Sequence, residues 1–159
     1  MEIQELGEDI IDFFKQRVTE LMLPLEVKWL YQACPNQKQL IKLSKINDQY
    51  KFATGCDILV QVNPEYYDKF DAEDTKIIEI LFDQEIDTIT FNMEKGTFKV
   101  GKPTFKSNVG IINKYTYDEV ARAVETERLL TSQNADKERE AKDQAAEEKK
   151  AKRQYNKRK

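Results

Sequence analysis

The sequence predicts an α+β domain, with a small mixed or antiparallel sheet covered by helices and with a long charged helix after it. Two patterns support this fold class. Apolar residues recur three and four positions apart over residues 2–21, which indicates an amphipathic helix. Short segments rich in β-branched and aromatic residues follow, at 25–31, 39–44 and 57–63. Beyond Leu130 no large apolar residue occurs until Tyr155, so the end of the chain is predicted to lie outside the core.

Charge divides the chain into two parts, which we interpret as two domains. Residues 1–130 contain 16 lysines and arginines and 23 acids, and residues 131–159 contain 10 and 6. The net charges are therefore −7 and +4, which together give the −3 of the whole chain. We expect an acidic α+β globular domain over 1–130 and a charged helical tail with a basic end over 131–159. The first part is long enough for one hydrophobic core without disulfides or metal.

The composition and the N-terminal sequence also indicate the cellular location of the protein. The chain has two cysteines and no histidine, and Cys34 and Cys56 form no CxxC motif, which argues against a disulfide scaffold or a zinc knuckle. The acidic N-terminal sequence lacks the basic region of a signal peptide. No apolar run approaches the roughly 18 residues of a membrane span. We therefore expect a soluble cytoplasmic protein that does not associate with membranes.

The first half of the predicted domain is a helix followed by alternating strands and short helices. Pro24 ends the first helix, and residues 25–31 then alternate in polarity as a half-buried strand does. We expect this strand to form a hairpin with 39–44. A short helix over 45–53 is predicted to end at Gly55, because glycine readily adopts the left-handed conformation. The segment 57–63 is the strongest strand in the chain.

The second half begins at Asn63-Pro64, a pattern typical of a helix cap and first helical residue. One or two helical turns over 65–70 precede an apolar helix over 75–89, with Asp71 and Asp74 in a capping arrangement. The later elements are a hairpin over 90–100 ending in Gly-Lys-Pro, a helix over 109–115 and a long helix from Tyr117 that projects away.

The candidate site lies on the helix 75–89, where four acid or amide side chains occupy five consecutive positions. They are Asp83, Gln84, Glu85 and Asp87. Asp83 and Asp87 are four residues apart and therefore face the same side of a helix. This is the spacing of two metal ligands on a zinc peptidase helix. The alternatives are a hard-cation or acid–base site and the plain polar face of a helix, which the 35% charged residues favour.

These residues resemble a known family. The segment Asp57–Phe70, an acidic helix start and then Leu81–Asp87 are similar to the zincin-like metallopeptidases encoded in bacteriophage genomes. In that family a strand ending in an Asn or Ser turn and a short helix precede an HExxH helix. The resemblance covers residues 25–90 and implies a zincin-like fold. The whole chain also resembles uncharacterised phage proteins that share the strand, the helix, the hairpin and a charged tail.

The family motif is degenerate in this chain. In one register Asp83 and Asp87 replace the histidines and Gln84 replaces the glutamate. In the other register Glu85 keeps the glutamate position, but Gln84 and Thr88 replace the histidines. A catalytic zinc site needs three protein ligands, usually with histidine among them, and neither register provides them. We therefore predict no catalytic residues, no bound metal and no cofactor, and an active zinc peptidase is not expected.

The tail ends in a run of cations without an acid. Its basic residues are Lys149, Lys150, Lys152, Arg153, Lys157, Arg158 and Lys159. Such a run is able to hold a nucleic-acid backbone without recognising its sequence, or to contact an acidic protein. The structural alternative is a solubilising terminus or cations that stabilise the C-terminal end of a helix. The acidic domain itself is not expected to lie on DNA.

Three functional hypotheses follow from the sequence. The first is a non-catalytic phage-type structural or interaction protein, a degenerate zincin-like domain whose tail reaches a protein partner such as a virion component. The alternative is a nucleic-acid-associated accessory protein that binds non-specifically through residues 149–159. The third is a hydrolase with a metal other than zinc at Asp83, Glu85 and Asp87. For a phage-encoded protein the expected location is the host cytoplasm or the virion.

Overall fold

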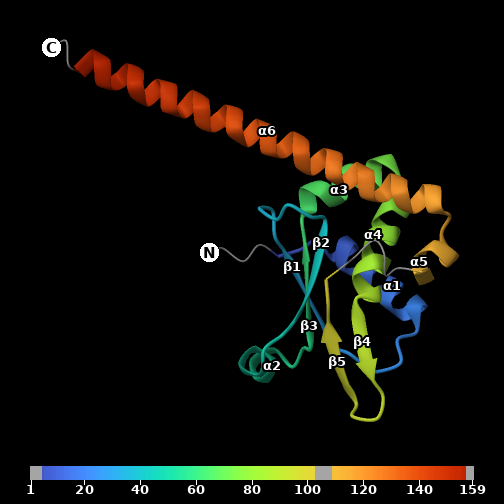
Figure 1. Cartoon of the computed structure of the whole chain (residues 1–159). Coiled ribbons are helices and arrows are strands. Elements are labelled where there is room, and N and C mark those ends of the chain that lie inside the picture. The colour runs from blue at the N-terminus through green and yellow to red at the C-terminus, as the bar shows by residue number, and fades with distance from the viewer. Residues whose placement is uncertain (1–4, 103–108, 157–159) are drawn as a thin grey trace. The chain divides into compact units, whose positions relative to one another are not determined.

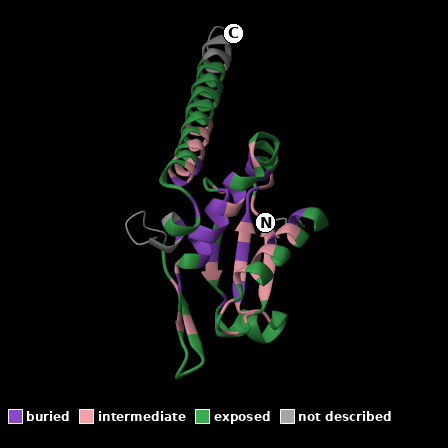
Figure 2. Cartoon of the chain, turned by 90° about the vertical axis from the view of Figure 1, so that its right-hand side faces the viewer, coloured by how far each residue is buried: buried purple, intermediate pink, exposed green. Residues whose placement is uncertain are grey.

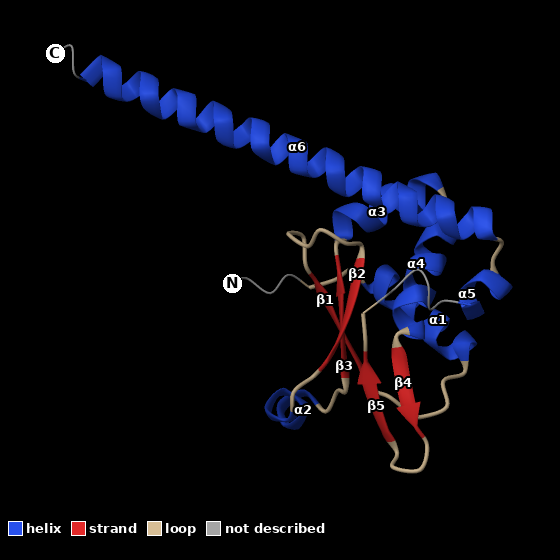
Figure 3. Ribbon diagram, in the orientation of Figure 1, coloured by secondary structure: helices blue, strands red, loops and turns tan. Residues whose placement is uncertain are grey.

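The chain folds into a mixture of helices and small sheets, as the sequence predicts (Figure 3). A computed structural model describes residues 5–102 and 109–156. In chain order the elements are α1 (Glu8–Leu21), β1 (Trp29–Ala33), β2 (Ile41–Lys45), α2 (Asp48–Thr54), β3 (Ile58–Val62), α3 (Pro64–Glu73), α4 (Thr75–Asp87), β4 (Ile89–Asn92), β5 (Thr97–Val100), α5 (Val109–Lys114) and α6 (Tyr117–Asn156). Among the helices of these described residues, none is long and apolar enough to cross a membrane.

The main sheet has three strands in the order β1-β3-β2, and it is mixed. Strand β3 runs parallel to β1, with Trp29 opposite Ile58, and antiparallel to β2, with Leu43 opposite Val60. The predicted hairpin between the first two strands is therefore wrong, because β3 lies between them. The most apolar strand takes the central position, where both of its backbone edges find hydrogen-bond partners. Strand β1 begins at Trp29, opposite Ile58, the first residue of β3, and the carbonyl of Lys28 just before it accepts hydrogen bonds from the N–H groups of Asp57 and Ile58.

One face of this sheet is covered by α1 and α4, which lie on the same side of it in Figure 1. The ring of Phe14 on α1 stacks against Tyr31 of β1, with centroids 6.4 Å apart. The same ring meets Phe82 of α4 at 4.7 Å. Phe14 and Phe82 are both fully buried. The sequence prediction that the first helix and the apolar helix cover the sheet is thus confirmed.

The predicted helix caps are present in the structure. The side chain of Asn63 accepts hydrogen bonds from the backbone N–H groups of Glu65 and Tyr66 at the start of α3. Gly55, at φ 68°, ends α2 in the left-handed conformation. The helix after Asn63 is longer than predicted, because the cap and Pro64 begin a full α3 rather than one or two turns.

Helix α4 begins and ends slightly differently from the prediction. Asp74 is its N-cap and accepts a hydrogen bond from the N–H of Lys76, whereas Asp71 accepts one from the hydroxyl of Thr75. The helix ends at Asp87, and Ile89 already belongs to β4. Strands β4 and β5 form the predicted hairpin, with Phe91 opposite Phe98. Pro103, the last residue of the predicted hairpin end, lies outside the described residues.

The chain divides into two compact units at Val124. Helix α6 belongs to both, and in the first unit it contributes the buried Val120 and Ala123. In the second unit every residue from 136 to 150 is exposed, so this helix has no apolar face of its own there. The sequence analysis places the boundary between globular domain and tail after residue 130, and this boundary stays a prediction.

Candidate functional site

The four motif residues lie on α4 but do not share one surface. Asp83 is 2% exposed, Gln84 and Glu85 are 8% exposed, and Asp87 is exposed to solvent. Figure 2 shows α4 as the most continuously buried helix of the first unit, because α3, α5 and the strand β2 all contact it. Three polar side chains are therefore drawn into the core by the packing of their helix, and each must find partners there.

Asp83 forms a two-point ion pair with Arg17 of α1. The guanidinium Nε donates to Oδ1 at 2.9 Å, and Nη2 donates to Oδ2 at 2.6 Å. The side chain of Arg17 is itself only 11% exposed. Its outer nitrogen Nη1 donates to Glu20 on the same helix at 2.8 Å. This parallel arrangement is the strongest geometry available between an arginine and a carboxylate.

Two further donors complete the surroundings of Asp83. The ammonium of Lys114, at the end of α5, lies 2.9 Å from Oδ2. The hydroxyl of Tyr115 donates to the same oxygen at 2.8 Å and accepts a hydrogen bond from Arg17 at 2.7 Å. One buried carboxylate thus joins α1, α4 and the end of α5. We call these four residues, Arg17, Asp83, Lys114 and Tyr115, the Asp83 cluster.

The cluster fixes the charge of its members. Burial alone would raise the pKa of the Asp83 carboxyl, but the hydrogen bonds from Arg17, Lys114 and Tyr115 outweigh it, and the pKa lies below its usual value. The hydrogen bond to Asp83 raises the pKa of Arg17. Burial, together with the hydrogen bond to Asp83, raises the pKa of the Tyr115 phenol. At neutral pH Asp83 is therefore a carboxylate, Arg17 a cation and Tyr115 a neutral phenol.

Glu85 faces a different part of the molecule. Its Oε2 accepts a hydrogen bond from the backbone N–H of Leu43 in β2 at 3.3 Å. Residues two apart on a helix are about 200° apart around its axis, so Glu85 points away from Asp83. Leu43 N–H lies on the edge of β2 that β3 does not occupy, because β2 pairs with β3 through residues 42 and 44. Glu85 therefore binds the free edge of the sheet.

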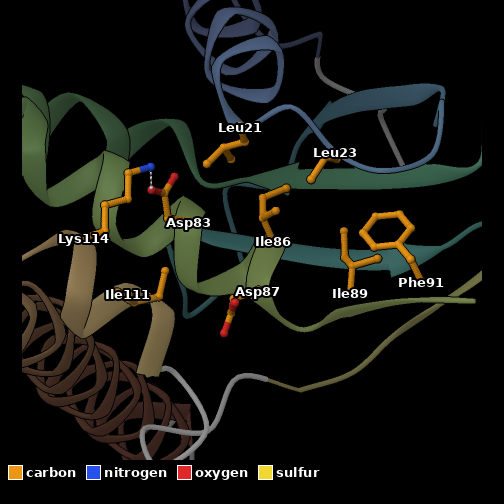
Figure 4. Close-up of a pocket in the computed structure, with 9 residues that line it drawn as sticks. All are labelled: Leu21, Leu23, Asp83, Ile86, Asp87, Ile89, Phe91, Ile111 and Lys114. Atoms are coloured by element: carbon orange, nitrogen blue, oxygen red, sulfur yellow. Dashed lines mark hydrogen bonds and ion pairs between the residues drawn. The ribbon is translucent and has the colours of Figure 1, made fainter.

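Asp83, Asp87 and Lys114 line a pocket of about 320 Å³. The rest of its lining is apolar and comes from the end of α1 and the segment after it, from α4, β4 and α5 (Figure 4). These residues are Leu21, Leu23, Ile86, Ile89, Phe91 and Ile111. Asp83 and Asp87 thus line the same pocket, whereas Glu85 contacts β2 instead.

The basic residues predicted in the tail are described only in part. Lys149 and Lys150 are exposed on α6. Lys152 and Arg153 lie within the same helix, and nothing is described of their side chains. Lys157, Arg158 and Lys159 lie outside the described residues.

Arg17, Lys114 and Tyr115 are the site residues that the sequence analysis missed. For Arg17 a signal existed, because it follows Phe13 and Phe14 by four and three residues and so shares the apolar face of its helix. A cation at such a position predicts a buried acid as its partner. Nothing comparable marks Lys114 and Tyr115, which are brought to the site by the tertiary fold.

The described residues contain no group of three or more histidine, cysteine, aspartate or glutamate side chains arranged to hold a metal ion. Comparisons of the chain with protein-family models, with curated proteins and with solved structures give no match.

Proposed function

We propose that the protein is a non-catalytic interaction protein, built on a degenerate zincin-like domain of the bacteriophage type, with a charged C-terminal helix that reaches a protein partner. The observation that supports this most is the Asp83 cluster. The carboxylate at the position of a metal-binding histidine is occupied by Arg17, Lys114 and Tyr115. The domain would then be a stable structural support for the tail. Its former reaction site would be part of the domain's core.

The chemistry of the cluster argues for a structural role. A metal ion bound at Asp83 would have to displace a two-point guanidinium contact and an ammonium, and it would leave both cations without their acid. Such an exchange costs several kcal/mol, because breaking a buried ion pair leaves an unpaired charge. An acid–base role is disfavoured in the same way, since Asp83 stays ionised and its oxygens already accept four hydrogen bonds.

The order of the elements is also consistent with the proposed ancestry. The resemblance expects a strand, an Asn turn, a short helix and then the motif helix. In the structure these are β3, Asn63, α3 and α4. Element order is a weaker argument than the cluster, because many α+β folds place a strand before a pair of helices.

Metal titration tests the non-catalytic part of the proposal. We expect Zn²⁺, Mn²⁺ and Mg²⁺ to leave the thermal unfolding midpoint of the full chain unchanged, because a metal ion at Asp83 would have to compete with Arg17 and Lys114 for its carboxylate. A stabilisation that disappears in the double variant Asp83→Asn, Asp87→Asn would contradict the proposal and revive the metal-hydrolase hypothesis. The control is Glu94→Gln, which removes an exposed acid from the β4–β5 turn.

Site-specific cross-linking tests the partner. A photoreactive residue at the exposed position Lys150 of the full chain should give adducts that a protease removes and a nuclease does not. The same probe at Glu94 is the matched exposed control. Adducts of equal intensity from both positions would contradict a role of the tail.

The second candidate, non-specific nucleic-acid binding, is favoured by the separation of charge along the tail. Residues 149–159 contain seven cations and no acid, and Lys149 and Lys150 are exposed. If this candidate holds, micromolar protein binds DNA at low salt and the affinity falls steeply with salt, by a slope of about −0.7 to −0.9 per phosphate neutralised. Truncation after Gln144 should abolish the binding, as measured by fluorescence anisotropy. Nuclease-sensitive adducts at Lys150 would favour it over a protein partner.

A further inference from the structure

The pocket beside the Asp83 cluster has a charged side and an apolar side. Figure 4 shows Asp83 and Lys114 together on one side and Ile89 and Phe91 on the other, with Ile86 between them. Its volume of about 320 Å³ is at the lower end of the range for small-molecule sites. A lining that is mainly apolar with a few polar groups is also typical of such sites.

The three charges in the lining are not equivalent. Lys114 pairs with Asp83 at 2.9 Å, and Asp83 is also paired with Arg17. Asp87 forms no hydrogen bond or ion pair with any residue that the structure describes, and it is exposed. Asp87 is therefore the one charge of this lining that has no partner within the described chain.

We propose that this pocket binds a small primary amine with an apolar stem. The ammonium would contact Asp87, and the stem would lie against the apolar side formed by Ile86, Ile89 and Phe91. A charge-assisted hydrogen bond provides orientation, and removal of the stem and of these side chains from water provides most of the affinity. This inference concerns the first unit alone and does not depend on the role proposed for the tail.

The charges favour an amine over a carboxylate as the ligand. Two carboxylates and one ammonium line the pocket, and the ammonium is already engaged by Asp83. Residues 1–130 have a net charge of −7, so the field around the domain attracts cations and repels anions. A carboxylate ligand would reach Lys114 only beside the carboxylate of Asp83.

Three probes of equal stem length test this choice on the full chain: n-hexylamine, 1-hexanol and hexanoate. Binding is followed by NMR through the methyl groups of Leu21, Ile86 and Ile111, which lie in the pocket wall. We expect hexylamine to bind more tightly than hexanol, and hexanoate to bind most weakly. Tighter binding of hexanoate than of hexylamine would overturn the proposal, as would the absence of shifts at these methyl groups.

Substitution of Asp87 tests the contact itself. Asp87→Asn should weaken hexylamine binding about twofold to fivefold, the effect of losing one exposed charge pair, and should leave hexanol binding unchanged. Glu94→Gln is the matched control, because it removes the same charge from an exposed turn away from the pocket. An equal loss in both variants would overturn the specific contact and leave only a general field effect. Both variants should retain the unfolding midpoint of the wild type, since both acids are exposed.

Discussion

The Asp83 cluster and the helix beyond residue 130 are both built from charged residues, but their surroundings are opposite. Asp83 is 2% exposed and accepts hydrogen bonds from three side chains, one from α1 and two from the end of α5. Every residue from 136 to 150 is exposed. A buried charge is stabilised by its partners, whereas an exposed charge is stabilised by water. The same kind of substitution should therefore change the free energy of unfolding by very different amounts in the two regions.

The largest effect is expected for Asp83→Asn. The substitution keeps the shape of the side chain but leaves Arg17 and Lys114 facing a neutral group. We expect the free energy of unfolding to fall by about 3 to 5 kcal/mol, the usual effect of breaking a buried ion pair. Chemical denaturation at neutral pH measures the change. Asp87→Asn, one helical turn later and exposed, is the control, and we expect it to stay within about 0.5 kcal/mol. Equal losses in the two variants would show that burial does not distinguish these positions.

The pH dependence of stability should sharpen the same contrast. The folded-state pKa of Asp83 lies below its usual value. A carboxyl group of this kind contributes stability above its unfolded pKa of about 3.9 and loses the contribution as the pH falls through the lower folded pKa. We therefore expect the difference in unfolding free energy between wild type and Asp83→Asn to be constant from pH 7 to about pH 5 and to shrink below about pH 4. A difference that grew on acidification would contradict the ion-pair assignment.

Glu85→Ala should have an intermediate effect. The substitution removes the acceptor of the Leu43 N–H at the free edge of β2. An unpaired buried donor costs about 1 to 3 kcal/mol, so the free energy of unfolding should fall by about that amount. Glu79→Ala on the same helix is the matched control for helix propensity, because Glu79 is not buried. If the two alanine variants were equally stable, the edge contact would contribute nothing measurable.

The smallest effect is expected in the tail. Glu138 and Lys142 are four residues apart on α6 in the favourable order. Glu138→Gln should reduce helix stability by only about 0.3 kcal/mol, and circular dichroism at 222 nm should fall slightly at low salt. In 1 M salt the difference should vanish, because exposed charges are screened over a few ångströms. A loss that persisted at high salt would indicate a contact other than this ion pair.

Local features were the part of the fold that the sequence predicted well. Asn63-Pro64 and Gly55 mark helix ends because their preferred backbone angles and hydrogen bonds act within a few residues. The strand 57–63 was recognised from its β-branched and apolar residues, and the structure has it as β3. The mixed α and β class follows from such local patterns.

Pairings between distant segments were predicted less well. Nothing in residues 25–31 shows that their neighbour is β3 rather than the next strand, because both partners offer the same alternation of buried side chains. The spacing of Asp83 and Asp87 predicted only that they face the same side of a helix, and the pocket that both line is formed by other elements of the fold. The pairing of Arg17 with Asp83 could not be predicted, because it depends on how α1 packs on α4. Only the position of Arg17 on the apolar face of its helix can be seen in the sequence.

The insertion of β3 between β1 and β2 has a consequence for the order of folding. Lys45 and Trp29 both pair with Ile58, but the chain that joins Lys45 to Ile58 is much shorter. Closing the longer loop costs roughly 0.7 kcal/mol more in chain entropy. We therefore expect β2 and β3 to pair before β1 adds in parallel. Stopped-flow kinetics would show it: Leu43→Val should mainly slow folding, whereas Ala33→Gly should mainly speed unfolding. The reverse pattern would mean that the parallel pair forms first.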